Sequence, residues 1–204
     1  MAGEARVHVI DDDESVRDSL AFLFESADLA VRTYDSASSF LEALGAVGPS
    51  CVVTDVRMPG MSGIDLLRGL KARGAGLPVI VITGHGDVPL AVEAMRDGAF
   101  DFLEKPFVDE QLLGSVRRAL AQAAGGAGDG DRQAARARLS RLSGRERQVL
   151  TRLVAGQLNK TIAHELDISI RTVEVYRAKV MDKMEAASFA DLVRMTVLAG
   201  EGDR

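Results

Sequence analysis

Five polar side chains stand at or just beyond the ends of short apolar runs in the first half of the chain: Asp11, Asp12, Asp55, Thr83 and Lys105. If each run is a strand of one parallel sheet, these side chains meet at the same edge of that sheet. Three carboxylates crowded there repel one another, so we expect a bound cation, and oxygen ligands with room for water favour Mg²⁺. Such an edge can place a phosphoryl group on a carboxylate, with Lys105 supplying positive charge and Thr83 a hydroxyl.

Short apolar runs alternate with helical patterns through the first 123 residues. We predict strands over residues 7–10, 29–33, 51–54, 78–82 and 101–103. We predict helices over residues 15–27, 36–44, 63–71, 88–97 and 109–123. Five strands alternating with five helices indicate an α/β domain, a five-stranded parallel sheet covered by helices on both faces.

The second part of the chain shows helical patterns and no further strand. Four glycines between Gly125 and Gly130 mark a boundary, so we predict a first domain over 1–123, a flexible linker over 124–138 and an all-α domain over 139–204. Helices are predicted over residues 131–141, 143–156, 160–166, 170–184 and 188–198.

Helix-start signals support three of these helices. Ser143 and Glu146 form a capping box, Asn159 caps a short helix, and Ser169 caps a longer one. A short helix, the tight turn 167–170 and a longer helix make a helix-turn-helix, the motif that places its second helix in the major groove of DNA.

The formal charge is divided unequally between the two parts. Residues 1–130 carry a net charge of -9 and residues 131–204 a net charge of +4. This asymmetry favours nucleic-acid binding by the second part alone, although a solvated basic surface explains the same charge equally well.

The acidic motifs resemble the receiver domain of response regulators, a CheY-like and flavodoxin-like fold. The resemblance is carried by Asp-Asp after the first strand, Thr-Asp-Val-Arg-Met-Pro-Gly-Met-Ser-Gly at 54–63, Thr83, and Lys-Pro-Phe at 105–107. It implies that Asp55 is the phosphoacceptor nucleophile, and that Lys105 contacts the phosphoryl group next to a cis bond to Pro106. It also implies a switch pair, Thr83 and Phe102.

The same resemblance implies the ligands of a Mg²⁺ ion. Asp12 and Asp55 would bind the metal directly, Asp11 would act less directly, and the backbone carbonyl of Arg57 would be a further ligand.

Residues 159–184 resemble the LuxR-type helix-turn-helix domain. The resemblance implies that Glu174, Val175 and Ala178 face base edges, where Glu174 can accept from cytosine and the two apolar side chains can touch a thymine methyl. Five other side chains would contact phosphates: Lys160, Arg171, Thr172, Arg177 and Lys179. Tyr176 stands where the family commonly has His.

The two domains together resemble the NarL/FixJ group of transcription regulators. The stretches 83–89, 104–107 and 171–181 are similar to members that work with FixL, an oxygen-sensing haem kinase, and activate nitrogen-fixation genes. The resemblance implies a FixL-like sensor histidine kinase, double-stranded DNA and RNA polymerase as partners. It further implies that phosphorylation promotes a homodimer and releases the DNA-binding domain.

Three other functions compete with this interpretation. An aspartyl-phosphate phosphatase needs a second acid two residues after its nucleophile, and Arg57 stands there, so we expect no enzyme. A regulator of the same group that answers another signal stays open, as does a DNA-binding protein that needs no phosphorylation. The apolar runs are too short for a membrane span, no secretory signal is visible, and the single Cys51 excludes a disulfide framework, so we expect a cytoplasmic protein.

Overall fold

Five parallel strands form one sheet in the order β2-β1-β3-β4-β5. The strands are β1 (Arg6–Ile10), β2 (Ala30–Tyr34), β3 (Ser50–Asp55), β4 (Val79–Thr83) and β5 (Asp101–Glu104). The computed structural model describes residues 6–44, 50–84, 88–125 and 129–200. All five predicted strands are confirmed within one or two residues, as is the parallel α/β architecture.

Helices alternate with the strands as the apolar patterns predict. They are α1 (Glu14–Ser26), α2 (Ala37–Ala43), α3 (Gly63–Ala72), α4 (Val88–Asp97) and α5 (Asp109–Ala123). Side-chain caps fix several starts, because Asp13, Ser36 and Ser62 each accept a hydrogen bond from a backbone N–H in the first turn.

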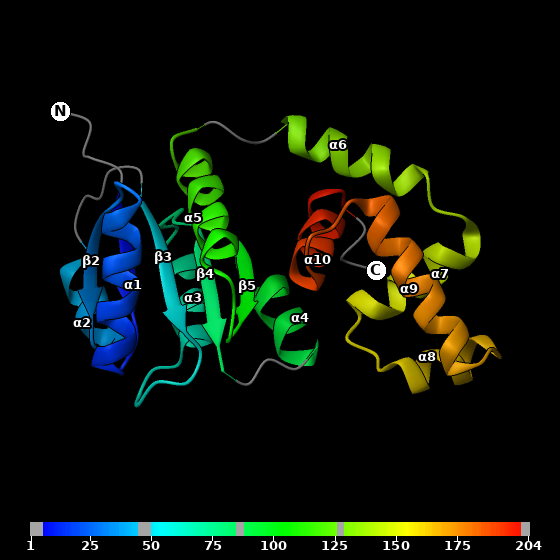
Figure 1. The fold of residues 1–204 in the computed structure, drawn as a ribbon, viewed down its shortest axis with the longest axis horizontal. Helices are drawn as coiled ribbons and strands as arrows, with labels where there is room; N and C mark the ends of the chain where they lie inside the picture. The colour runs from blue at the N-terminus through cyan, green and yellow to red at the C-terminus, as the bar shows by residue number, and fades with distance from the viewer. Residues whose placement is uncertain (1–5, 45–49, 85–87, 126–128, 201–204) are drawn as a thin grey trace. The chain divides into compact units, whose positions relative to one another are not determined.

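Both faces of the sheet are covered, since successive strand residues point to opposite sides. Val7 and Val9 of β1 share one core with the inner sides of α1 and α5, including Phe24 and Leu112. Figure 1 shows α1 and α5 in front of the sheet, with α2 and α3 behind it. On the second face the His8 ring contacts Phe40 of α2. The buried thiol expected for Cys51 is confirmed, and burial raises its pKa to about 12.

Five further helices follow: α6 (Asp129–Ser140), α7 (Gly144–Val154), α8 (Asn159–Leu166), α9 (Ile170–Met184) and α10 (Phe189–Leu198). Their apolar faces enclose a core in which Val149, Leu153, Ile162 and Val173 are almost fully buried. The chain divides into two compact units, residues 1–86 with 97–127, and residues 87–96 with 128–204. In the described part of the chain, no helix is long and apolar enough to cross a bilayer.

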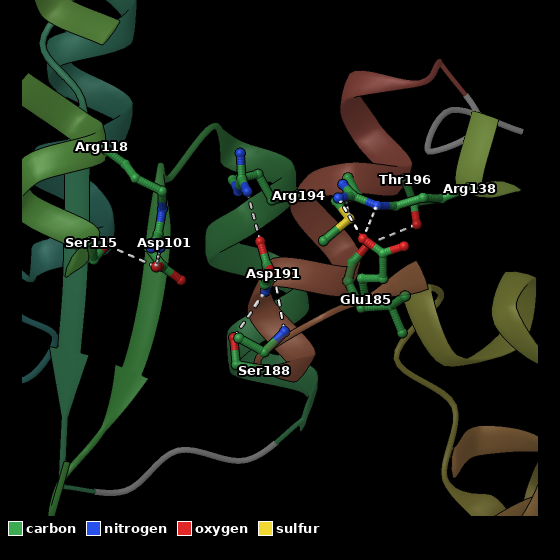
Figure 2. A network of polar contacts seen from close by, with 12 residues as sticks. Asp101, Ser115, Arg118, Arg138, Glu185, Ser188, Asp191, Arg194 and Thr196 are labelled. Carbon is green, nitrogen blue, oxygen red and sulfur yellow. Dashed lines mark hydrogen bonds and ion pairs between the residues drawn. The ribbon is translucent and has the colours of Figure 1, made fainter. Parts of the chain in front are cut away.

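The helix predicted over 131–141 is confirmed as α6, and the linker predicted over 124–138 therefore needs a correction, because α6 already begins at Asp129. Ala135 and Leu139 are buried, and α6 packs against α9 and α10. On the exposed side of the helix, Arg138 and Arg141 both donate hydrogen bonds to the carboxylate of Glu185 (Figure 2 shows the Arg138 bond). The glycine-rich composition therefore marks a much shorter connection, of which residues 126–128 lie outside the described part.

The predicted caps of α7 and α9 are confirmed, but that of α8 is not. Ser143 and Glu146 form a reciprocal capping box, and Ser169 accepts from the N–H of Thr172. Asn159 is the first helical residue rather than the cap, and the capping position belongs to Leu158, which makes no side-chain cap bond.

A buried carboxylate joins the fifth strand to the fifth helix. Asp101 is 4% exposed and accepts hydrogen bonds from Ser115 Oγ at 2.8 Å and from Arg118 at 3.0 Å, as Figure 2 shows. Its other oxygen accepts from the N–H of Phe102 at 2.9 Å. The start of β5 is therefore held at a set position along α5.

The buried side chain of His8 should make the stability of the first unit depend on pH. Its ring is 3% exposed, and burial, followed by the charges of Arg6 and Arg32, lowers its pKa from 6.5 to about 4. In the unfolded chain His8 becomes protonated below about pH 6.5, whereas in the folded chain it stays neutral down to about pH 4. Protons therefore favour the unfolded chain, and the free energy of unfolding falls as the pH falls through this window. Between pH 7 and pH 4.5 we expect His8 to contribute a loss of about 2 kcal/mol.

Urea unfolding of the wild type and of His8→Gln at both pH values measures this contribution. Carboxylates titrate in both proteins, so only the difference between them reports on His8. An equal loss of stability in the two proteins would show that the pKa of the His8 imidazole is not lowered by folding.

Candidate functional site

The predicted acidic residues lie at the carboxyl edge of the sheet, near the point where the strand order reverses between β1 and β3. Asp55 is the last residue of β3, and Asp11 directly follows β1. Thr83 is the last residue of β4, and Lys105 directly follows β5. The parallel register brings these strand ends together, because Ile10 lies opposite Thr54 and Ile82 opposite Asp55.

Lys105 links the two buried acids. Its Nζ donates to Asp55 Oδ1 at 2.9 Å and to Asp11 Oδ2 at 3.1 Å. Burial alone would lower the pKa of Lys105, but the bonds and charges of Asp55 and Asp11 outweigh it and raise that pKa above its usual value. The peptide bond from Lys105 to Pro106 is cis, as expected.

Asp55 is held at both carboxylate oxygens. Besides the bond to Lys105, its Oδ2 accepts the backbone N–H of Arg57 at 2.6 Å. Its side chain is 12% exposed, against 3% for Asp11, so Asp55 is the more accessible of the two acids bound to the lysine. A carboxylate with fixed orientation, partial exposure and a neighbouring ammonium group is suited to nucleophilic attack.

Asp11 carries a charge that its surroundings compensate incompletely. Burial raises its pKa, and this outweighs the lowering by the Asp13 N–H and by Lys105. Asp12 differs, because its side chain is exposed.

These residues fit Mg²⁺ by their chemistry. Carboxylate oxygens of Asp11 and Asp55 converge on one ammonium nitrogen, and Mg²⁺ needs only one or two carboxylates when water completes its shell. Among the described residues, no three His, Cys, Asp or Glu side chains are grouped closely enough to hold a metal by themselves.

Gly63 is a residue of the site that the sequence reasoning missed. It is the first residue of α3, and its N–H donates to the carbonyl of Val56 at 3.0 Å. A Cβ at this position would overlap the backbone carbonyl of Asp55 and lie 3.2 Å from Thr54 Cγ2. Only glycine lets α3 start this close to the strand end. Its position eight residues after Asp55 was the available signal.

The predicted switch residues are both buried. Thr83 is 1% exposed and Phe102 is 7% exposed. The backbone of Thr83 is joined to the acidic site, because its carbonyl accepts the N–H of Lys105 at 2.8 Å.

The helix-turn-helix is packed as its apolar pattern predicts. The predicted inner residues are all buried: Ile162, Ala163, Leu166, Val173, Val180 and Met184. Asp167 ends α8 in the left-handed conformation (φ 52°), and the turn leads to the Ser169 cap of α9. Six of the eight predicted DNA-contacting side chains are exposed: Lys160, Arg171, Glu174, Val175, Ala178 and Lys179.

The other two predicted DNA contacts are half-buried and engaged within the domain. The Arg177 guanidinium lies 5.5 Å from the centre of the Phe189 ring. Thr172 Oγ1 lies 2.8 Å from Ser169 Oγ. Lys179, although exposed, has its Nζ 6.0 Å from the centre of the Tyr176 ring. Tyr176, which departs from the usual His, packs against the core of the domain.

Known proteins share both parts of the chain. Residues 7–117 match the family model described as the response regulator receiver domain. Residues 140–196 match that of the bacterial regulatory proteins of the luxR family.

Relatives match nearly the whole length. The transcriptional regulatory protein FixJ of Azorhizobium caulinodans is 60% identical over 195 residues, 95% of this chain and 92% of that protein. The C4-dicarboxylate transport transcriptional regulatory protein DctR of Rhodobacter capsulatus is 47% identical, over 93% of this chain and 98% of its own length. Among solved structures, full-length FixJ from B. japonicum has 51% identity and a TM-score of 0.58, covering 97% of this chain and 98% of that one.

Gly63→Ala should destabilise the first unit by about 1–3 kcal/mol, because the added methyl group meets backbone atoms that cannot move aside. Gly69→Ala is the matched control on the same helix, where nothing lies within 4 Å of the new Cβ, and it should be neutral or stabilising by up to about 1 kcal/mol. Thermal unfolding of the wild type and of both variants measures the two changes in stability. Equal stability of the two would mean that α3 can shift without cost.

Proposed function

The chain belongs to the NarL/FixJ group of response regulators, which join a receiver domain to a LuxR-type DNA-binding domain, and we propose that phosphorylation of Asp55 activates it. A FixJ-like role in transcription regulation follows from the family. The observation that carries the proposal is the Asp55 carboxylate, whose side chain is 12% exposed at the strand end and accepts a hydrogen bond from Lys105 at 2.9 Å.

In the proposed reaction, a carboxylate oxygen of Asp55 attacks the phosphorus of a phosphohistidine on a sensor kinase. The new O–P bond forms as the P–N bond to the kinase imidazole breaks, and the imidazole takes up a proton. Lys105 supplies positive charge to the phosphoryl oxygens, and the Arg57 N–H orients the carboxylate during attack. Thr83 supplies a hydroxyl to the phosphoryl group once it has arrived. The chain acts as acceptor in this transfer.

Mg²⁺ would be held by Asp11, Asp12, Asp55 and the backbone carbonyl of Arg57. When bound, it supplies the positive charge that lets a phosphoryl group approach three carboxylates. The convergence of the Asp11 and Asp55 carboxylates on one ammonium nitrogen supports this assignment, since both acids then lie within reach of a single cation.

The proposed response begins at Thr83 and Phe102. Movement of Thr83 toward the phosphoryl group makes room for the Phe102 ring, and the altered receiver surface favours a homodimer. Dimerisation would release the DNA-binding domain from restraint by the receiver, as a shift between two populations.

DNA would be read by α9. The exposed side chains of Glu174, Val175 and Ala178 are proposed to face base edges. The proposed phosphate contacts are Lys160, Arg171, Thr172, Arg177 and Lys179. Arg177 and Thr172 would have to exchange their contacts within the domain for contacts with phosphates.

The relatives support proposals for signal and partners. A FixL-like kinase, RNA polymerase and nitrogen-fixation genes under low oxygen fit the FixJ relatives. The DctR relative favours a second candidate, a regulator of the same group that answers another signal.

Asp55→Asn should abolish phosphoryl uptake and leave the fold intact, because the amide keeps the shape of the carboxylate and lacks its nucleophilic oxygen. Intact-mass measurement after incubation with acetyl phosphate and MgCl₂ tests this, and EDTA should suppress uptake in the wild type. Asp28→Asn is the control, an exposed acid at φ 60° where asparagine is tolerated. An adduct of undiminished yield on Asp55→Asn would refute the assignment.

Glu174→Ala should change base preference at one operator position by about 1–3 kcal/mol, whereas Lys179→Ala should weaken binding to all sequences about equally. Titrations against single-base operator variants separate the two effects. Asp182→Ala is the control: it removes another exposed acid from α9 and should change neither the base preference nor the overall affinity for DNA. Uniform weakening by Glu174→Ala would count against a base contact.

A fragment of residues 129–204 should bind the operator more tightly than the unphosphorylated full chain. If the restrained form is favoured about 100:1, release raises apparent affinity by up to about 100-fold. The fragment starts at Asp129 because α6 packs on α9 and α10. Affinities of the fragment, the full chain and its phosphorylated form, at one salt concentration, test the proposal. A fragment no tighter than the full chain would show that the receiver does not restrain binding.

A further inference from the structure

Arg17 folds back from the first turns of α1 onto the acidic turn that precedes the helix. One nitrogen of its guanidinium donates to the backbone carbonyl of Asp11 at 2.8 Å and to that of Asp12 at 3.0 Å. Two successive carbonyl groups therefore point to the same donor, and this sets the orientation of both peptide groups.

The two acids depend on this contact to different degrees. Asp11 has further restraints, because its Oδ1 accepts the N–H of Asp13 at 3.0 Å and its Oδ2 accepts from Lys105. The exposed carboxylate of Asp12 makes no hydrogen bond or ion pair with any described residue. Its position is therefore set through its backbone, whose carbonyl Arg17 holds.

We propose that Arg17 is a positioning residue of the phosphorylation site, which orients Asp11 and Asp12 for a divalent cation and so strengthens binding of that cation. The inference rests on the proposed function, in which these two acids hold Mg²⁺. Groups that hydrogen-bond behind metal ligands commonly change metal affinity by 10–100-fold when they are removed. Without the guanidinium, the two carbonyls turn toward water separately, and the acids lose their common orientation.

The charge of Arg17 and its hydrogen bonds act in opposite directions on cation binding. A guanidinium close to the site repels a divalent cation, so loss of its charge alone would tighten binding. Loss of the two carbonyl bonds would weaken binding. The sign of the change therefore separates positioning from a general electrostatic effect.

Arg32 provides a matched control. It lines the same surface pocket as Arg17, beside Tyr34 and Asp35, but its guanidinium lies over the Tyr34 ring at 5.3 Å. No hydrogen bond joins it to the acidic turn within the described residues. Arg32→Met thus removes a charge from the same pocket and leaves the carbonyls of Asp11 and Asp12 bound.

The experiment uses the unphosphorylated full chain and Mn²⁺ as probe, followed by electron paramagnetic resonance, with Mg²⁺ as competitor. Arg17→Met should raise the Kd of both metals about 10-fold, and Arg32→Met should change it less than about 2-fold. Arg17→Lys, which keeps the charge and a donor on a shorter stem, should fall between the wild type and Arg17→Met. In a second readout, phosphoryl uptake from acetyl phosphate by Arg17→Met should need about 10-fold more Mg²⁺ for half-maximal rate, with a similar rate at saturation.

Unchanged or tighter Mn²⁺ binding by Arg17→Met would overturn the inference, as would equal weakening by Arg32→Met. If circular dichroism shows that Arg17→Met does not fold, the Kd of Arg17→Lys for Mn²⁺ tests the inference instead. An Arg17→Lys variant that binds Mn²⁺ as tightly as the wild type would then overturn it. A wild type that binds neither metal would remove the metal from the proposed function and this inference with it. A wild type that binds, beside an Arg17→Met variant that binds equally, would overturn this inference alone.

Discussion

One ammonium group shared by two buried carboxylates is the interaction on which the acidic edge of the sheet depends. Asp11 and Asp55 lie at the ends of neighbouring strands, and without Lys105 their like charges would face each other in a poorly solvated place. The parallel sheet brings the three residues together because its strands end at one edge. Gly63 completes the arrangement, since it lets α3 begin against the backbone of Asp55. The fold thus concentrates negative charge and keeps enough positive charge beside it to stay folded.

In the DNA-binding unit, an ion pair between a buried acid and a lysine holds two helices together. Glu146 closes the capping box of α7 and accepts from Lys183 of α9 at 2.7 Å. The bond to Lys183, together with the backbone N–H of Ser143, lowers the pKa of Glu146 to about 2. The start of α7 is therefore fixed to the end of α9, and Arg138 and Arg141 fix α6 to Glu185, one residue beyond that end. The recognition helix is held at one end, and its exposed side chains nearer the start are left for a partner.

Much of this architecture could be predicted from sequence, because strands and helices bury apolar residues with periods that are readable locally. The acidic edge could be predicted as well, since parallel strands bring their ends together in any sheet of this kind. The α6 boundary could not be read from glycine content, because burial of Ala135 and Leu139 depends on helices that come later in the chain. Arg17 was missed for a similar reason. Its position on α1 shows a basic residue in an amphipathic helix, and only the three-dimensional turn shows which carbonyls it reaches.

The charge balance of the site favours a neutral group as the first to respond in the proposed phosphorylation. Two buried acids share one lysine, and the exposed Asp12 follows Asp11 directly. In the proposed function a divalent cation offsets this negative charge when a phosphoryl group approaches, so that the lysine and the cation are then both engaged. The negative charge that the proposed phosphorylation adds at Asp55 would then be met by a donor that brings no charge of its own. Thr83 is placed for this, being buried at the end of the next strand with its carbonyl bonded to the backbone of Lys105. Hydrogen bonds therefore join the acidic edge to β4, and on β5 the N–H of Phe102 is bonded to Asp101, which Ser115 of α5 holds. In the proposed function, a chemical change at one carboxylate would reach a distant surface through these hydrogen bonds, which already exist in the resting fold.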